Sequence, residues 1–282
     1  MIDKDAITQL QQGAAIAQAM AATTAAAQDQ TKLLSLPSDF KHKDLESFMP
    51  TRRRARGKMT TTVAADFAKY VASHCELGCH VFIDQQDMSA RAVLNLGTPT
   101  EPGHADNVAV LATKMTAAYQ ALLSVANGQG QKQATVAEFL EDWAGNVQCF
   151  HDGGELTLPK AVAAVRKITI EALRKMETAE GQLSASRSAF ESVTASSGAD
   201  PLPTTIYFAC EPYAGLSPRT FVLRLSILTG NDKPALCLRI VKHQEHVEEM
   251  AADLAKVVDG AMQAHKETGV IPVLIGTYEA RQ

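Results

Sequence analysis

The residues whose types and spacing most clearly suggest chemistry are basic. Between Lys41 and Lys58 the chain carries seven lysines and arginines and two acids, a local charge of +5. Five of these cations stand close together, namely Arg52, Arg53, Arg54, Arg56 and Lys58. Arginine presents a planar fork of donors that matches phosphate, and it is less strongly hydrated than lysine. The segment therefore predicts binding of nucleic acid or another polyanion. A solvated run, or ion pairing with a neighbouring subunit, is the alternative.

The global charge does not reveal this segregation. The 282 residues carry a formal net charge of −4, so the residues outside the basic run together carry −9. The isoelectric point of about 6.1 excludes a globally basic nucleic-acid binder and leaves only a local patch. Hydrophobic residues make up 46% and charged residues 21%, which is typical of a folded globular chain.

A second basic pair is predicted on a hairpin near the C-terminus. If Gly230–Lys233 form a four-residue loop, the leucines and isoleucines of the flanking strands fall on one face of the hairpin. The other face then places Arg224 opposite Arg239. Like charges directly opposite each other are unfavourable unless an anion intervenes. That anion could be a ligand, a partner chain, or Glu211 on the neighbouring strand, and an internal acid is the preferred interpretation.

Soft metal ligands cluster in the segment His74–His80, which contains two cysteines and two histidines. Zinc sites need two such clusters with tight spacing, so buried free thiols are the preferred interpretation of Cys75 and Cys79. The histidines of the segment His243–Glu249 suit the polar start of a helix. The chain has no phosphate-binding glycine motif and no nucleophile elbow. We therefore predict no metal site, cofactor or catalytic residue, and a metal-dependent enzyme using His74–His80 is only a third hypothesis.

The N-terminal region predicts a helical arm. Residues 6–28 are uncharged and rich in alanine and glutamine, which are strong helix formers. One weakly apolar stripe follows helical spacing, and it consists of Ile7, Leu10, Ala14, Ala17 and Ala21. Such a helix either packs on its own domain or frays, or it packs on a neighbouring subunit. The second interpretation predicts a homo-oligomer held together by this stripe.

The remaining periodicity predicts an α+β fold, with the N-terminal helical arm, a central β-meander with helices, and a C-terminal β-β-β-α-β unit. The arm covers residues 1–32, the central region 33–183 with a long helix at 159–183, a serine-rich linker 184–203, and the C-terminal unit 204–282. Within the central region the pattern predicts a helix at 63–74 and strands at 81–83, 92–94 and 108–111. The C-terminal unit is predicted to have strands at 206–210, 219–229, 235–242 and 270–275 and a helix at 244–267.

The cysteines and the apolar runs indicate a compartment. Five cysteines, an odd number without a disulfide framework, predict reduced thiols in a cytoplasm. No apolar run approaches the roughly 18 residues of a membrane span, so no membrane contact is expected. The N-terminus has no basic region typical of a secretory signal.

Several segments together resemble the YfdQ-like family of phage and prophage proteins. They are Leu36–Phe40, Asp44–Glu46, Pro50 with Arg52–Arg54, Gly57, Asp66-Phe67, Tyr70-Val71, Phe139–Asp142 and the hairpin at 219–242. The resemblance covers about residues 3 to 278. It implies a bacteriophage-type origin, a bacterial cytoplasm, and a role in phage DNA metabolism or in interference with host defence. The family has no assigned catalytic residues, so none can be transferred to this chain.

Two functions follow from these observations. The first is a non-enzymatic, homo-oligomeric phage accessory protein that binds nucleic acid, another polyanion, or a host or phage protein through residues 52–58. The second is a self-assembling structural protein, shell-like in character, in which subunits exchange their N-terminal arms.

Overall fold

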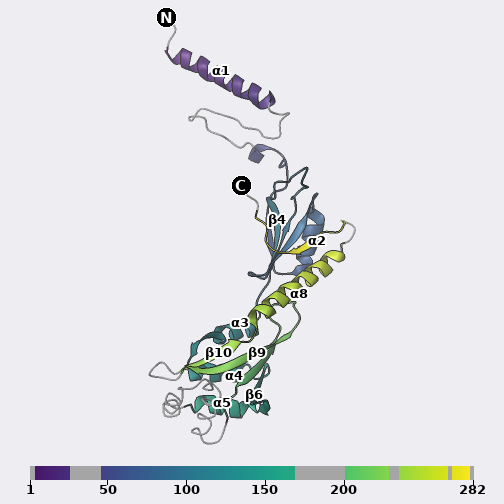
Figure 1. The fold of residues 1–282 in the computed structure, drawn as a ribbon. Helices are drawn as coiled ribbons and strands as arrows, with labels where there is room; N and C mark the ends of the chain where they lie inside the picture. The colour runs from purple at the N-terminus through teal and green to yellow at the C-terminus, as the bar shows by residue number, and fades with distance from the viewer. Residues whose placement is uncertain (1–3, 26–45, 169–200, 229–234, 266–268, 280–282) are drawn as a thin grey trace. The chain divides into compact units, whose positions relative to one another are not determined.

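The structure is a computed structural model that describes residues 4–25, 46–168, 201–228, 235–265 and 269–279. The chain divides into two compact units, Met1–Ala55 and Arg56–Gln282, which are treated separately below. Figure 1 shows the arrangement within each unit and labels many of the helices and strands. The predicted boundaries at residue 32 and at residues 184–200 lie outside the described residues.

The first unit contains the predicted N-terminal helix. Helix α1 extends from Lys4 to Ala25, and its alanines and glutamines account for its helical conformation. A short 3₁₀ helix, η2, covers Glu46–Phe48. The Glu46 carboxylate accepts a hydrogen bond from the backbone N–H of Arg53 at 3.2 Å, and this contact closes the turn that follows η2.

The second unit begins with a five-stranded sheet in the order β1-β4-β3-β2-β11. Its strands are β1 (Gly57–Thr61), β2 (His80–Asp84), β3 (Ser89–Val93), β4 (Asn107–Ala112) and β11 (Val273–Ile275). Strands β2, β3 and β4 form the predicted antiparallel meander. The two edge strands pair in parallel, β1 with β4 and β11 with β2.

Two amphipathic helices pack on this sheet. Helix α2 (Ala64–His74) contacts β1 and β4, and helix α8 (His243–Gln263) contacts β2, β3, β11 and α2. Phe67 and Val71 of α2 are fully buried, and Leu254 and Val258 of α8 are at most 1% exposed. The apolar spacing that predicts each helix thus corresponds to its buried face. No helix in the described ranges is long and apolar enough to cross a bilayer.

A second, six-stranded sheet has the order β5-β10-β9-β8-β6-β7, and every pair in it is antiparallel. Its strands are β5 (Asn127–Gln131), β6 (Val147–His151), β7 (Gly154–Leu156), β8 (Thr205–Cys210), β9 (Arg219–Leu228) and β10 (Ala235–Ile240). Helices α3 (Ala117–Val125), α4 (Gln133–Asp142) and α5 (Leu158–Arg166) contact it.

These helices cover one face of the six-stranded sheet. Phe208 of β8 is buried on that face, where its ring lies 5.3 Å from the ring of Phe139 and 6.3 Å from that of Trp143. Leu223 and Leu238 are also fully buried there. Side chains alternate across a strand, so the residues between these buried ones point to the opposite face.

The α+β fold class is confirmed, with two differences of arrangement. The C-terminal elements occur in the predicted order β8, β9, β10, α8, β11. They do not form a sheet of their own, because β11 joins β2 in the first sheet while β8, β9 and β10 join β5 and β6 in the second. The central region likewise contributes strands to both sheets.

The second difference concerns the predicted helix at 159–183. Helix α5 ends at Arg166, and the backbone N–H of Lys167 caps it by donating to the carbonyl of Ala163. The side chain of Gln133 donates to the carbonyl of Ile168 at 2.7 Å. Within the described residues the predicted helix therefore corresponds to α5 alone, and residues 169–183 lie outside them.

The connection between α2 and β2 packs closely against the loop after β3. Gly78 has a φ of +76°, and a Cβ at this position would lie 1.8 Å from the carbonyl oxygen of Gly97. The backbone N–H of Gly97 donates to the carbonyl of Leu77 at 2.9 Å and holds the two loops together. Only glycine satisfies both the left-handed conformation and this close approach.

We expect Gly78→Ala to lower the free energy of unfolding by about 3 kcal/mol or more, because the new methyl group collides with backbone and φ is unfavourable. Gly153→Ala is the matched control, since Gly153 has a φ of +82° with open space around its Cβ position. Its cost should be about 1 kcal/mol, from the backbone conformation alone. Urea denaturation measures both, and equal losses would contradict the close-packing argument.

Candidate anion-binding surfaces

The hairpin β9–β10 has the predicted register. Leu225 lies opposite Leu238 on the buried face, and Arg224 lies opposite Arg239 on the exposed face. Directly opposed residues of an antiparallel pair have Cβ atoms about 5 Å apart. The structure therefore places two exposed arginines next to each other on one face of the sheet.

No acid neutralises this pair within the described part of the chain. Neither Arg224 nor Arg239 forms an ion pair or a hydrogen bond with any other side chain there. The prediction that Glu211 serves as the internal partner is wrong. Its carboxylate accepts from the backbone N–H of Gly215 at 2.6 Å, at the end of β8 far from Thr205, the residue that lies opposite Arg224.

A third arginine of the same hairpin has the opposite surroundings. Arg219, at the start of β9, has a side chain only 12% exposed, and its guanidinium lies 2.6 Å from Asp253 and 3.1 Å from Glu249 of α8. It also donates to the backbone carbonyl of His246 at 3.2 Å. Arg219 is thus a largely buried cation that is ion-paired with acidic side chains. Arg224 and Arg239 are exposed and have no acidic partner among the described residues.

The basic run is distributed over both units. Arg52 and Arg53 are exposed and Arg54 is half-buried in the first unit, after η2. Arg56 and Lys58 are exposed in the second unit, where Lys58 lies in β1 opposite Val108. All five cations are accessible to solvent at least in part, as contact with a polyanion requires. The charged residues at 41, 43 and 44 lie outside the described residues.

The predicted stripe of the arm lies on α1. Ile7 is 45% exposed and Leu10 is 71% exposed. Ala14, Ala17 and Ala21 are exposed too. Another apolar residue, Ile16 on the opposite side of the helix, is 42% exposed. The helix therefore presents apolar side chains that make no buried core in its own unit.

The cysteine and histidine segment forms a structural loop. Cys79 is buried, and burial together with the nearby Cys75 sulfur raises the pKa of its thiol. Nδ1 of His80 lies 2.7 Å from the carbonyl oxygen of Gly78, and Nδ1 of His74 lies 3.0 Å from that of Tyr70. Among the described residues, no group of three or more histidines, cysteines and acids is arranged to hold a metal ion.

The beginning of α8 contains a polar cluster that the sequence did not reveal. The hydroxyl of Tyr119, a buried residue of α3, lies 3.3 Å from Nε2 of His243. His246 packs its ring against that of Phe221, with centroids 4.9 Å apart. Burial lowers the pKa of His246, and the positive charges of Arg219 and His243 lower it further, against the opposing effect of Glu249 and Glu245.

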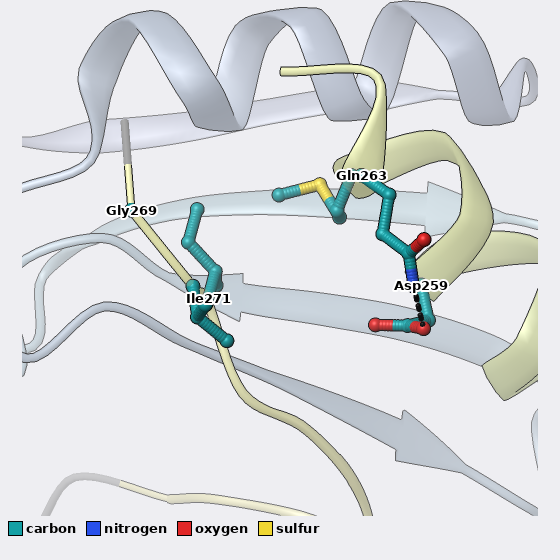
Figure 2. Close-up of a pocket in the computed structure, with 6 residues that line it drawn as sticks. Asp259, Gln263, Gly269 and Ile271 are labelled. Carbon is teal, nitrogen blue, oxygen red and sulfur yellow. Dashed lines mark hydrogen bonds between the residues drawn. The ribbon is translucent and has the colours of Figure 1, made fainter. Parts of the chain in front are cut away.

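A pocket of about 410 Å³ lies where α8 ends and the chain leads into β11 (Figure 2). Met262 and Ile271 form its apolar walls. Its polar side chains already satisfy each other, because Nε2 of Gln263 donates to the Asp259 carboxylate at 2.8 Å. The pocket offers apolar surface but no convergent polar groups that would orient a substrate.

The chain matches a known protein family. Residues 4–278 match the family model of an uncharacterized conserved protein, DUF2303. The chain belongs to the DUF2303 family. No curated protein and no solved structure shows a significant match to it.

The titratable and basic groups of this DUF2303 chain lie in contrasting surroundings. Burial raises the pKa of buried thiols, for example that of Cys149 to about 11. Arg224, Arg239 and most cations of the basic run are exposed on the surface. The opposed arginines were predictable from alternation in two strands, whereas the α8 cluster depends on contacts between elements far apart in sequence.

We expect the stability of this DUF2303 protein to fall as the pH drops below about 6.5, because of His246. In the unfolded chain this histidine titrates near its ordinary pKa of 6.5, whereas its folded pKa is lower, so the unfolded state binds the proton more readily. This loss of stability is absent at a pH above the pKa of His246 in the unfolded chain. It grows as the pH falls toward the lower pKa of His246 in the folded protein. His246→Gln should flatten the dependence between pH 7 and 5.5 in urea melts.

His104→Gln is the control, since His104 is exposed in the loop before β4. This variant should keep the pH dependence of the wild type. If both variants show the wild-type dependence, another group controls stability in this range.

Proposed function

We propose that this DUF2303 chain is a non-enzymatic accessory protein of a phage or prophage that binds nucleic acid and associates with itself. The observation that carries the proposal is the pair Arg224–Arg239. These guanidinium groups are opposed on an exposed sheet face, and no acid within the described residues neutralises them. A bound phosphate chain would relieve their repulsion and accept their hydrogen bonds.

The basic run supports the same proposal. Its five cations at 52–58 contrast with a net negative charge on the rest of the chain. A local basic surface on an acidic protein attracts polyanions while limiting non-specific association elsewhere. The phage or prophage setting, the bacterial cytoplasm and a role in DNA metabolism or counter-defence rest on the resemblance to YfdQ-like proteins. A host or phage protein with an acidic surface is the other partner that this charge would suit.

We expect the protein to bind a labelled 20-nucleotide DNA or RNA with an affinity that falls steeply between 50 and 300 mM salt. Arg224→Ala/Arg239→Ala should weaken binding and reduce the magnitude of the log–log salt slope by roughly 1.5, the value for two lost phosphate contacts. Arg52→Ala/Arg53→Ala/Arg54→Ala/Arg56→Ala should reduce it by roughly 3. Fluorescence anisotropy across the salt series measures both effects.

The matched control is Lys160→Ala/Arg166→Ala, which also removes two positive charges. Both residues lie on α5, which contacts the sheet, and both are exposed. This variant should keep the wild-type slope, and thermal melts should show all variants folded, because the hairpin arginines are exposed. Absence of salt-dependent binding by the wild type would overturn the proposal.

Self-assembly through α1 is a second candidate function, the one expected of a shell-like structural protein. The favouring observation is the exposed stripe of Ile7, Leu10, Ala14, Ala17 and Ala21. Small side chains allow two helices to approach closely, and the larger apolar ones gain free energy by burial. A helix of 22 residues whose only charged side chains are Lys4 and Asp5 suits contact with a second copy of itself through this surface.

We expect the wild type to be an oligomer in mass photometry, and Ile7→Ser/Leu10→Ser to shift it toward monomer by at least tenfold in dissociation constant. Deletion of residues 1–28 should have the same effect. Gln9→Ser/Gln12→Ser is the matched control, because these two residues lie on the opposite side of α1. A monomeric wild type at micromolar concentration would remove this candidate.

A further inference from the structure

The register of the six-stranded sheet aligns one residue from each strand on its exposed face. In strand order from β7 to β5, this arginine row consists of Glu155, Phe150, Thr205, Arg224, Arg239 and Asn127. Neighbouring strands are about 4.8 Å apart, so the row is roughly 24 Å long. It crosses a face that none of α3, α4 or α5 uses for its buried contacts, since the leucines and phenylalanines of the opposite face make those.

An aromatic pair lies beside the two arginines. Tyr207 of β8 stands two residues along from Thr205, which makes it a diagonal neighbour of Arg224, about 7–8 Å away. Its ring lies 4.8 Å from that of Phe150, at an interplanar angle of 44°. Tyr207 is 38% exposed, and the other exposed aromatic residue among the described residues, Phe48 at 74%, is in the first unit. This fold otherwise buries its large aromatic rings wholly or in part.

We propose that this face binds single-stranded nucleic acid, with bases stacked on Tyr207 and Phe150 and phosphates held by Arg224 and Arg239. The inference rests on the proposed function and specifies the kind of nucleic acid. In a duplex the faces of the bases are already stacked on each other, and only the phosphates can reach such a sheet. A single strand offers free base faces to aromatic rings and phosphates to arginines in the same segment.

The uncharged residues and the one acid of the face fit this arrangement. Gln148 and Thr205 carry donors and acceptors for base edges without adding charge. Glu155 ends the arginine row at β7 and repels phosphate, whereas Arg224 and Arg239 occupy the strands β9 and β10. The sugar–phosphate backbone is therefore directed to the β9–β10 side, and the bases to the aromatic pair.

Three probes of equal length test the proposal: oligo(dT) of 20 nucleotides, oligo(U) of 20 nucleotides, and a 20-bp DNA duplex. We expect the wild type to bind at least one single strand more tightly than the duplex at 100 mM salt. Tyr207→Ala should weaken single-strand binding about five- to a hundredfold, and leave duplex binding within twofold. Tyr207→Phe should keep wild-type affinity, because the ring is retained.

Gln148→Ala is the matched control, since Gln148 lies directly opposite Tyr207 in the neighbouring strand β6. It should change affinity less than threefold. A second measurement does not depend on any variant: a 5-iodouracil-substituted single strand should photo-cross-link to Tyr207 or Phe150, as mapped by mass spectrometry of the digested complex.

The outcomes separate the two proposals. Equal single-strand and duplex affinity, with no effect of Tyr207→Ala, would overturn the stacking proposal while nucleic-acid binding itself stands. Competition by poly-glutamate as strong as that by oligo(dT) would overturn it in favour of an acidic protein partner. If the wild type binds none of the three probes, the proposed function and this inference both fail.

Discussion

The ion pairs of Arg219 connect the two sheets of the larger unit. Helix α8 packs on the five-stranded sheet, and its Asp253 and Glu249 hold a guanidinium that belongs to β9 of the six-stranded sheet. Burying a guanidinium is costly unless its donors are satisfied; here two carboxylates and a backbone carbonyl accept from Nη1 and Nη2, whereas Nε has no partner among the described residues. These contacts hold the beginning of β9 against α8.

Because side chains alternate along a strand, two arginines of β9 have opposite surroundings. Arg219 and Arg224 are separated by an odd number of positions, so they project from opposite faces of β9. One enters a polar interface with α8 and is neutralised. The other meets Arg239 on a face that the helices of this sheet leave uncovered. The surface charge of this face thus follows from the alternation of side chains along β9 and β10.

Prediction from the sequence succeeded where the determinants are local. Alternation and the turn-forming residues around 230–233 were sufficient for the β9–β10 register, and helical spacing was sufficient for α2 and α8. Prediction failed where a segment distant in the sequence determines the local structure. Strand β5 contains two glycines and no β-branched residue, and it is a strand only because β10 offers it an edge. The stacking of Phe150 on Tyr207 depends on the pairing of β6 with β8, which no local pattern indicates.

The pairing of β11 with β2 has a consequence for the order of folding. On the ribosome, β1 to β4 are translated early, yet β2 remains an uncovered edge until Val273 and its neighbours emerge to pair with Val81. The whole six-stranded sheet is synthesised in the interval, and helix α8, which covers the first sheet, arrives only just before β11. Contacts between residues so far apart in the sequence form slowly. The nascent first sheet therefore exposes the unpaired edge of β2 for most of translation. A chaperone that shields this edge would act on the nascent chain between the synthesis of β2 and that of β11.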